Sequence, residues 1–275
     1  MTLTPDSFLA RAVADALAAS AARAASLPEP ELRAAAGGAP PARGLRAALA
    51  APGVGLIAEV KRRSPSVGPI RPALDPAALA GAYERGGASA VSVLTEPVHF
   101  GGSPADLEAV RAAVGLPVLR KDFVTSAYQV WEARAWGADA VLLIVAALTG
   151  AQLADLLAEA AEAGIDALVE VHDDTEAAAA AVAGANLIGV NARDLRTLEV
   201  DLGRFAAIAA GLPPDAVLVA ESGIRDRADV EAAAAAGAHA VLVGETLVRA
   251  EDPARAVAAL LGLDSGSGGT AAAEP

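Results

Sequence analysis

The stretch LIAEVKRRSPS sets a carboxylate and an amine two residues apart at the end of an apolar run. Side chains two apart on a strand point to the same side, so Glu59 and Lys61 share one face. Burying either charge alone is strongly unfavourable, whereas each lowers the cost of burying the other. The pair therefore predicts a buried site that handles protons.

Polar residues also end several other apolar runs of the chain. A single charge at a strand end is usually a solvated rim residue or half of a structural ion pair. Several such ends at one mouth indicate instead a mutually neutralising polar site, and such clusters are often functional. The residues in question are Lys121, Glu170, Asn191, Arg193, Glu221 and Ser222.

Lysine usage indicates the same positions. Lys61 and Lys121 are the only lysines among 21 basic residues. Arginine stays protonated at any working pH, whereas a desolvated lysine can lower its pKa and pass a proton. Chance can leave two lysines anywhere, but both fall at predicted strand ends, and we expect proton transfer there. The three histidines, His99, His172 and His239, show no metal-ligand spacing and are interpreted as structural or rim residues, so we predict no metal.

A repeated unit predicts how these residues are positioned. Each copy reads as a helix, a glycine and then an apolar strand, and the glycine suits a left-handed helix C-cap. Alternating helices and buried strands predict parallel pairing through helical crossovers. The copies are GGASAVSVLTE, WGADAVLLIVA, EAGIDALVEVH, AGANLIGVNA and AGAHAVLVGE.

Three further apolar runs, at 56–60, 117–123 and 216–221, bring the number of expected strands to eight. Eight βα units favour a closed (β/α)8 TIM barrel, in which the carboxyl ends of the strands carry the chemistry. A doubly wound open sheet is the alternative. An open sheet of that kind would require a G-x-G-x-x-G phosphate-binding motif after its first strand, and the stretch KRRSPSVG found there does not contain it.

The sequence also predicts the organisation of the chain around the barrel. We expect an N-terminal helical extension over residues 1–50, a barrel over 51–263 and a flexible tail over 264–275. The first helix would have Thr4 as its N-cap, Pro5 in its first turn and an apolar stripe through Phe8, Val13 and Leu17. An irregular link would follow, marked by Pro28, Pro30, Gly37, Gly38, Pro40 and Pro41.

Two glycines follow the last two strands, Gly223 in ESGI and Gly244 in VGE. In TIM barrels the loops at these places often bind phosphate through backbone N–H groups. Each glycine alone would also suit an ordinary turn. Because both loops carry one, we expect a phosphorylated ligand.

Composition excludes several classes of function. The chain has no cysteine, so disulfides, thiolate metal sites and cysteine nucleophiles are ruled out. A net charge of −13 argues against general nucleic-acid binding. No apolar run is long enough to span a bilayer, and no basic segment followed by an apolar core begins the chain. We expect a cytoplasmic protein that binds neither nucleic acid nor membrane.

Taken in order along the chain, these residues resemble the indole-3-glycerol phosphate synthase family of tryptophan biosynthesis. The resemblance covers about residues 8–262. It rests on the stretches IAEVKRRSPS, SVLTEPVHFGGS, LRKDF, YQVWEARAWGADAVLLI, LVEVH, GVNARDL, ESGI and VLVGE.

The resemblance implies a decarboxylating ring closure of 1-(2-carboxyphenylamino)-1-deoxyribulose 5-phosphate, with no cofactor. By motif, Lys121 would be the general acid that protonates the substrate carbonyl oxygen, and Glu170 would act in the later proton transfers of dehydration. It implies a monomer or weak homodimer. The other implied catalytic residues are Glu59, Lys61, Asn191, Glu221 and Ser222, and the implied substrate-binding residues are Ser64, Phe100, Phe123, Arg193, Gly223, Gly244 and Glu245.

Three positions depart from the family pattern. The family usually has lysine where Val67 stands, a second asparagine where Ala192 stands, and often serine where Ala220 stands. Phosphate affinity or loop closure would be the properties affected. Two rival functions stay open at this point, a sugar-phosphate isomerase on the same barrel and a noncatalytic barrel that only binds a ligand. Two lysines with three glutamates fit ring closure better than enolisation.

Overall fold

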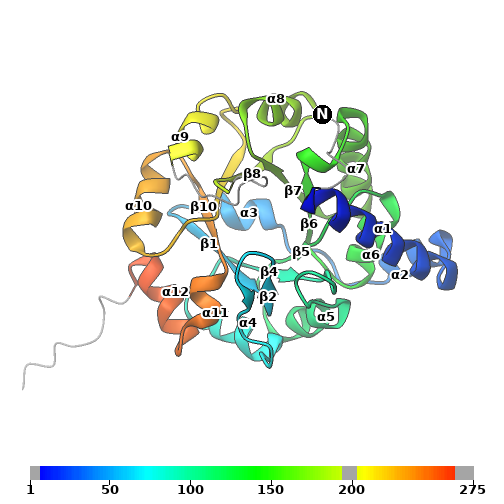
Figure 1. Cartoon of the computed structure of the whole chain (residues 1–275), viewed down its shortest axis with the longest axis horizontal. Coiled ribbons are helices and arrows are strands. Elements are labelled where there is room, and N and C mark those ends of the chain that lie inside the picture. Colours follow the sequence, from blue (N-terminus) through cyan, green and yellow to red (C-terminus); the bar gives the residue numbers. More distant parts are fainter. Residues whose placement is uncertain (1–6, 194–202, 264–275) are drawn as a thin grey trace, which may run out of the picture.

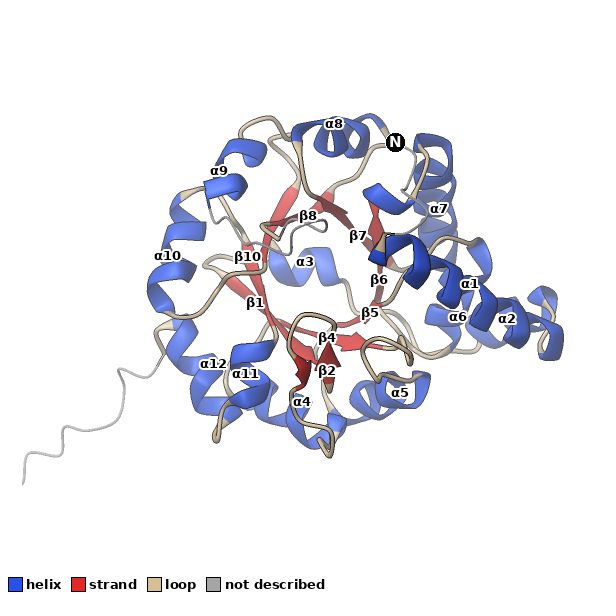
Figure 2. Cartoon of the chain, in the orientation of Figure 1, coloured by secondary structure: helices blue, strands red, loops and turns tan. Residues whose placement is uncertain are grey.

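Eight parallel strands close into a barrel that helices surround (Figures 1 and 2). The computed structural model describes residues 7–193 and 203–263. β1 pairs with β4 on one side and with β10 on the other, which closes the sheet. The predicted (β/α)8 barrel is therefore confirmed and the open sheet is wrong. The strands are β1 Gly55–Val60, β4 Ala90–Leu94, β5 Val118–Lys121, β6 Ala140–Ile144, β7 Asp166–Val171, β8 Leu187–Asn191, β9 Val217–Glu221 and β10 Ala240–Val243.

Helices connect successive strands on the outside of the barrel. A small antiparallel sheet, β2 Arg63–Ser64 with β3 Gly68–Pro69, lies in the connection after β1. Within the described ranges, the helices are too short or too polar to cross a bilayer. The helices after β1 are α4 Pro76–Arg85, α5 Pro104–Ala113, α6 Ala127–Ala135, the 3-10 turn η1 Val145–Ala147, α7 Gly150–Ala163, α8 Asp174–Val182, α9 Gly203–Ala209, α10 Arg227–Ala235, α11 Glu245–Arg249 and α12 Pro253–Leu261.

Left-handed glycines separate helix from strand in the repeated unit. A side chain with Cβ would be strained at such a backbone angle, whereas glycine adopts it freely. The predicted role of these glycines is confirmed at every copy of the unit. They are Gly87, Gly137, Gly164, Gly184 and Gly237, all with φ between 71° and 98°.

The strands are buried on both faces, because one face meets the helices and the other fills the barrel. Outward residues such as Val91 and Val141 pack under the helices, while Ile57 and Leu168 fill the interior. α3, Leu45–Leu49, joins the interior cluster and is seen through the centre of the ring in Figure 1. The backbone N–H of Arg46 in its first turn donates to Asp166 Oδ2, at the start of β7, at 2.8 Å, so α3 closes the amino-terminal end of the barrel and leaves the carboxyl end open.

The first helix begins later than expected. α1 spans Phe8–Ser26, and its N-cap is Ser7, whose hydroxyl accepts the N–H of Ala10 at 3.2 Å. The predicted N-cap was therefore wrong, and Thr4 and Pro5 lie outside the described residues. The expected apolar stripe is confirmed in part, because Phe8 and Val13 pack against the interior cluster whereas Leu17 is 41% exposed. The buried positions are Leu9, Ala12, Ala16 and Ser20.

The predicted irregular link contains a helix. α2, Glu29–Gly37, begins after Pro28 and holds Pro30 in its first turn, where no backbone N–H is needed. Its buried residues Leu32 and Ala36 pack onto the barrel layer. Tertiary contact thus overrides the proline and glycine signals there, whereas residues 40–44 do lack regular structure. The predicted flexible tail, 264–275, lies outside the described residues.

Candidate active site

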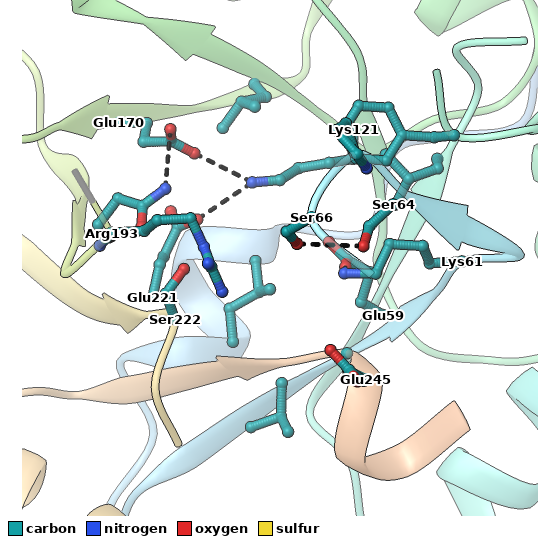
Figure 3. A pocket seen from close by; sticks show the side chains of 18 of the residues that line it. Glu59, Lys61, Ser64, Ser66, Lys121, Glu170, Arg193, Glu221, Ser222 and Glu245 are labelled. Atoms are coloured by element: carbon teal, nitrogen blue, oxygen red, sulfur yellow. Dashed lines mark hydrogen bonds and ion pairs between the residues drawn. The ribbon is translucent and has the colours of Figure 1, made fainter. Parts of the chain in front are cut away.

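One large cavity of about 1000 Å³ lies at the carboxyl ends of the strands. Every residue that the sequence singled out for the site lines it, although these residues come from seven different barrel strands or the loops after them. Figure 3 shows the side chains of nine of these residues, labelled there, around a common space. They are Glu59, Lys61, Ser64, Phe100, Lys121, Phe123, Glu170, Asn191, Arg193, Glu221, Ser222, Gly223, Gly244 and Glu245.

Lys121 lies at the centre of the polar side of the cavity. It is the last residue of β5, and its Nζ donates to Glu170 Oε2 at 3.0 Å and to Glu221 Oε2 at 3.1 Å (Figure 3). Both carboxylates are buried, and they come from β7 and β9 on the far side of the barrel mouth. The ammonium therefore bridges two strands that are not its neighbours in the sheet.

A second lysine–glutamate pair lies at the end of β1. Lys61 Nζ donates to Glu59 Oε1 at 2.5 Å, which confirms the shared face inferred from their spacing. The loop after β10 touches this pair: a Cβ added to Gly244 would meet Glu59 Oε1 at 2.6 Å and Lys61 Nζ at 3.0 Å. Glycine at 244 therefore lets the backbone lie against the ion pair.

The electrostatics at Lys121 differ from the sequence-based expectation. Burial lowers the pKa of Lys121, but the carboxylates of Glu170 and Glu221 outweigh burial and raise that pKa above its ordinary value. The expectation of a lysine with a lowered pKa was thus wrong. Lys121 holds its proton until an acceptor more basic than a carboxylate, such as the oxygen of an opening carbonyl bond, comes within reach.

Glu170 and Glu221 share the single positive charge of Lys121, and Glu221 is the carboxyl group that stays protonated. Burial raises the pKa of Glu221 to about 8, since the opposing effect of Lys121 is partly cancelled by the neighbouring Glu170. Its Oε1 is buried without a hydrogen-bond partner among the described residues. Lys121 and Glu170 thus form the ion pair near neutral pH, with Glu221 largely protonated beside them.

The raised pKa of Glu221 makes stability depend on pH. The unfolded chain loses this proton near pH 4.5 and the folded chain near 8, so folding stability declines between these values. We expect Glu221→Gln to be more stable than the parent at pH 9 and closer to it at pH 5, because glutamine mimics the protonated acid. Thermal melts at both pH values check this, and a variant equally destabilised at both would contradict a neutral Glu221.

Gly189 of β8 makes the room that Glu221 needs. A Cβ there would lie 2.0 Å from Glu221 Oε1 and 3.4 Å from a methyl group of Leu168. We expect Gly189→Ala to displace the carboxylate and lower turnover at least about tenfold, with a lower melting temperature. Gly150→Ala is the matched control, since an added Cβ there meets nothing within 4 Å. Equal turnover in the two variants would show that Glu221 tolerates displacement.

Glu170 is held by more groups than Lys121 alone. Asn191 Nδ2 donates to Glu170 Oε1 at 3.2 Å, and His172 Nε2 lies 3.3 Å from the same oxygen. His172 was predicted to be a structural or rim histidine, and this contact was not expected. A signal was available, because His172 stands two positions after Glu170, directly beyond the end of β7, where alternation brings it to the same side.

One wall of the cavity is apolar and aromatic. The rings of Phe100 and Phe123 lie 6.2 Å apart, and Phe8 of α1 adds a ring 6.2 Å from Phe123. Leu142 and Ile144 of β6 extend this wall. Such a surface accommodates a flat aromatic group. The sequence analysis placed Phe8 on a helix packed against the barrel but not in the site, because its contribution depends on where α1 docks.

The loop that carries Phe100 is organised by a buried carboxylate. Glu96 accepts the backbone N–H groups of Val98, His99 and Phe100 at 2.8, 2.6 and 3.0 Å. Its side chain is buried and belongs to the stretch SVLTEPVHFGGS. Glu96 thus fixes the aromatic wall, a role that sequence spacing alone does not reveal.

The opposite rim of the cavity suits an anion. Ser64 and Ser66 stand on the hairpin after β1, with their hydroxyl oxygens 3.3 Å apart. Across from them lies the turn at Ser222 and Gly223, both with left-handed backbone (φ 65° and 83°), which is strained for serine. Hydroxyl groups, exposed loop backbone and basic side chains are what a phosphate group requires. The arginines lining the cavity are Arg193, Arg225 and Arg249, of which only the first was predicted.

The donor set of the cavity does not suit a metal ion. Among the described residues, no three histidine, cysteine, aspartate or glutamate side chains are arranged as ligands. The carboxylates of Glu59, Glu170 and Glu221, which could have served as ligands, are bonded to lysine ammonium groups instead. The arrangement offers instead two ammonium groups bonded to buried carboxyl groups and an aromatic wall within one enclosure, which suits acid/base chemistry on an aromatic, phosphorylated molecule.

Comparison with known proteins indicates the same class. The family model for indole-3-glycerol phosphate synthase matches residues 9–260. Proteins named indole-3-glycerol phosphate synthase from Mycobacterium ulcerans and Rhodococcus jostii are each 57% identical over 241 residues, which is 88% of this chain and 89% and 90% of theirs. A Pyrococcus furiosus thiamine phosphate pyrophosphorylase structure superposes with a TM-score of 0.59 at 17% identity, covering 76% of this chain and 95% of its own. That likeness shows the barrel fold alone.

Proposed function

This chain belongs to the indole-3-glycerol phosphate synthase family, and we propose that Lys121 and Glu170 carry the proton transfers of its reaction. The reaction makes the chain a carboxy-lyase of tryptophan biosynthesis. It closes the ring of 1-(2-carboxyphenylamino)-1-deoxyribulose 5-phosphate to indole-3-glycerol phosphate, with loss of carbon dioxide and water. The sugar-phosphate isomerase and the noncatalytic barrel are thereby set aside.

The observation that carries the assignment of roles is the position of the Lys121 ammonium. It faces the cavity between the aromatic wall and two buried carboxyl groups, 3.0 and 3.1 Å away. We assign it the protonation of the substrate carbonyl oxygen while the aromatic carbon attacks. Glu170, bonded to Lys121, then serves the proton transfers that remove water.

The other residues of the cavity have supporting roles in this proposal. The aromatic ring of the substrate would lie against Phe100 and Phe123, and its phosphate at the rim formed by Ser64, Gly223 and the loop of Gly244. Lys61, which is paired with Glu59, lies where it offsets the negative charge of the substrate. Asn191 and Glu221 hold Glu170 and Lys121 in place, and Ser222, Arg193 and Glu245 complete the rim.

The three departures from the family pattern lie away from the reacting groups. Ala192 and Ala220 are 2% and 5% exposed and do not line the cavity, so they replace side chains that pack outside it. Val67 is 44% exposed on the hairpin between β2 and β3. We therefore expect Val67 to affect phosphate affinity rather than the chemical step.

The direct test is turnover of this substrate, followed by the appearance of indole fluorescence in a buffer containing a chelator. We expect full activity there, since neither a metal nor another cofactor is part of the proposal. Activity that is abolished by the chelator and restored by a metal ion would overturn this.

The negative net charge indicates which classes of molecule the protein binds. With a net charge of −13, we propose that it acts in the cytoplasm on a small phosphorylated substrate and binds neither nucleic acid nor membrane. We further propose a monomer or weak homodimer. Sedimentation of the full chain over a range of concentrations tests the oligomeric state, and a tight tetramer would contradict it.

A further inference from the structure

A histidine that the reaction does not use lies directly behind Glu170. His172 follows β7 and is buried, at 7% exposure, but it does not line the cavity. Its Nε2 lies 3.3 Å from Glu170 Oε1, yet among the described residues it has no hydrogen-bond partner of good geometry. The ring is therefore close enough to act on Glu170 but is screened from the substrate by it.

The other side of the ring is fixed by a second buried carboxylate. Glu176 of α8 accepts both the backbone N–H of His172, at 2.8 Å, and a bond from its Nδ1, at 2.9 Å, through the same oxygen. Glu176 is itself held by the helix N-cap, because its N–H donates to Asp173 at 2.9 Å. A carboxylate at Nδ1 requires the proton on that nitrogen, so only Nε2 is left to gain or lose one.

The state of Nε2 is then tied to that of Glu170. If Nε2 carries a proton, the ring is a cation that faces a carboxylate on each side. If Nε2 lacks it, its lone pair opposes the lone pairs of Glu170 Oε1 unless Glu170 is itself protonated. Burial lowers the pKa of His172, but Glu170 and Glu176 outweigh burial and raise that pKa to about 10. The imidazolium form prevails at neutral pH.

We propose that His172, oriented by Glu176, is a positioning residue that keeps Glu170 ionised and its oxygens aimed at Lys121 and the substrate. The proposal rests on the role given to Glu170 under the proposed function. Lys121 and Asn191 make direct contacts to Glu170, whereas His172 supplies a positive charge from behind the strand end. The pair formed by His172 and Glu176 is neutral overall, so it does this without adding net charge to the barrel.

The effect on Glu170 has a definite sign. Burial raises the pKa of Glu170, while the cations Lys121 and His172 together lower it well below its ordinary value. Removing the imidazolium therefore raises that pKa, and Glu170 is protonated over a wider acidic range. The charged or titratable groups that face the pair from neighbouring elements are Lys121 on β5, Glu221 on β9, and Asp173 and Glu176 at the start of α8.

The test compares kcat/KM against pH for the parent and for His172→Asn, since this profile reports groups of the free enzyme. We expect the acidic limb to move to higher pH by about one pH unit, the scale for losing one opposite charge nearby. Turnover should fall about tenfold on the acidic limb and far less at pH 8, with KM little changed. Ionisation of the substrate phosphate is common to all variants and does not contribute to the difference.

Two further variants make the test specific. His172→Gln places a neutral amide near the position of Nε2 and should restore part of the turnover but not the profile, while Glu176→Gln should shift the limb in the same direction by less. His239→Asn is the matched control, because His239 is exposed and caps a backbone N–H at the opposite end of the barrel. Thermal melts establish that each variant is folded. If His172→Asn does not fold, the pH profiles of His172→Gln and Glu176→Gln test the proposal.

The outcomes separate this inference from the proposed function. Superimposable profiles in folded His172 and Glu176 variants overturn the positioning role, provided that Glu170→Gln is inactive. Near-normal turnover in Glu170→Gln instead removes the proposed role of Glu170 itself. If the inference holds, adding His172→Asn to Glu170→Gln changes the residual pH profile no further, since the group that His172 acts on is gone.

Discussion

We expect Lys121→Arg to lose turnover by a factor of at least about 10², although it keeps the positive charge of the site. Arginine fills every other basic position except Lys61, so this chain accommodates it readily. At position 121, however, the donor must lie within hydrogen-bond reach of the substrate oxygen. The guanidinium is planar and holds its protons more tightly, so it misplaces the donor and releases the proton less readily.

The structure makes this substitution informative because the ammonium has two partners. The Lys121 side chain is 14% exposed and bonds to Glu170 and Glu221, and a guanidinium can satisfy both carboxyl groups as an ion pair. If Lys121 acts only as an electrostatic anchor for the substrate, arginine should serve almost as well. If it delivers a proton to the forming hydroxyl group, arginine fails although the charges are balanced.

The comparison therefore measures binding and turnover separately. Binding of a product-like ligand should change far less than kcat, and Lys121→Met should lose both, since it removes the charge and the donor. Equal losses of binding and turnover in the arginine variant would make Lys121 an anchor. Because arginine is bulkier, a thermal melt must first show that the variant is folded.

The placement of the site was predictable because strand geometry leaves little freedom. Glu59 with Lys61 and Asn191 with Arg193 are each two apart, and the carboxyl ends of parallel strands must meet at one mouth. A closed barrel then brings residues 100 positions apart, such as Lys121 and Glu221, to within a hydrogen bond of each other. The pattern of strands thus implies convergence without any knowledge of side-chain packing.

What the sequence did not reveal depends on contacts between elements. The contribution of Phe8 requires the docking of α1, whose buried face combines Leu9 with three small residues. The helix at α2 forms because Leu32 and Ala36 have a surface to cover. The direction of the pKa change at Lys121 follows from two carboxylates on distant strands, and burial alone predicts the opposite sign.

Histidine 172 shows a different reason for a missed residue. The lack of metal-ligand spacing argues against a metal site, but it does not exclude a histidine that acts on a carboxylate. Its neighbours in LVEVH and the acidic residue four positions later were both visible in the sequence. His172 stands two positions after the predicted catalytic carboxylate Glu170, and this spacing alone indicates that the two side chains are neighbours.

We expect Glu170→Gln to lower turnover by a factor on the order of 10² or more, the usual scale for a positioned acid/base group. Glutamine keeps the shape of the side chain, so its oxygen can still accept from Lys121 Nζ, as Glu170 does at 3.0 Å. It cannot exchange a proton at neutral pH. The loss should therefore appear mainly in kcat, with KM changed much less.

Stability should change only modestly in this variant, for a reason specific to the cluster. Removing one partner of a buried ion pair usually costs several kcal/mol, about 3–5, because the other charge is left uncompensated. Here Lys121 retains Glu221 at 3.1 Å, and loss of the Glu170 charge removes the repulsion that helps to raise the pKa of Glu221. Glu221 can then ionise near neutral pH and neutralise Lys121.

This compensation gives a second measurement on the same variant. The decline of parent stability toward pH 8, assigned to Glu221, should move to lower pH in Glu170→Gln, because Glu221 titrates earlier there. Glu231→Gln is the matched control, since it removes a carboxylate that is exposed and paired with Arg227 outside the cavity. Near-normal turnover in Glu170→Gln would demote Glu170 to a structural role. Lost turnover with an unmoved stability profile would keep Glu170 catalytic but show that Glu221 does not take over its charge.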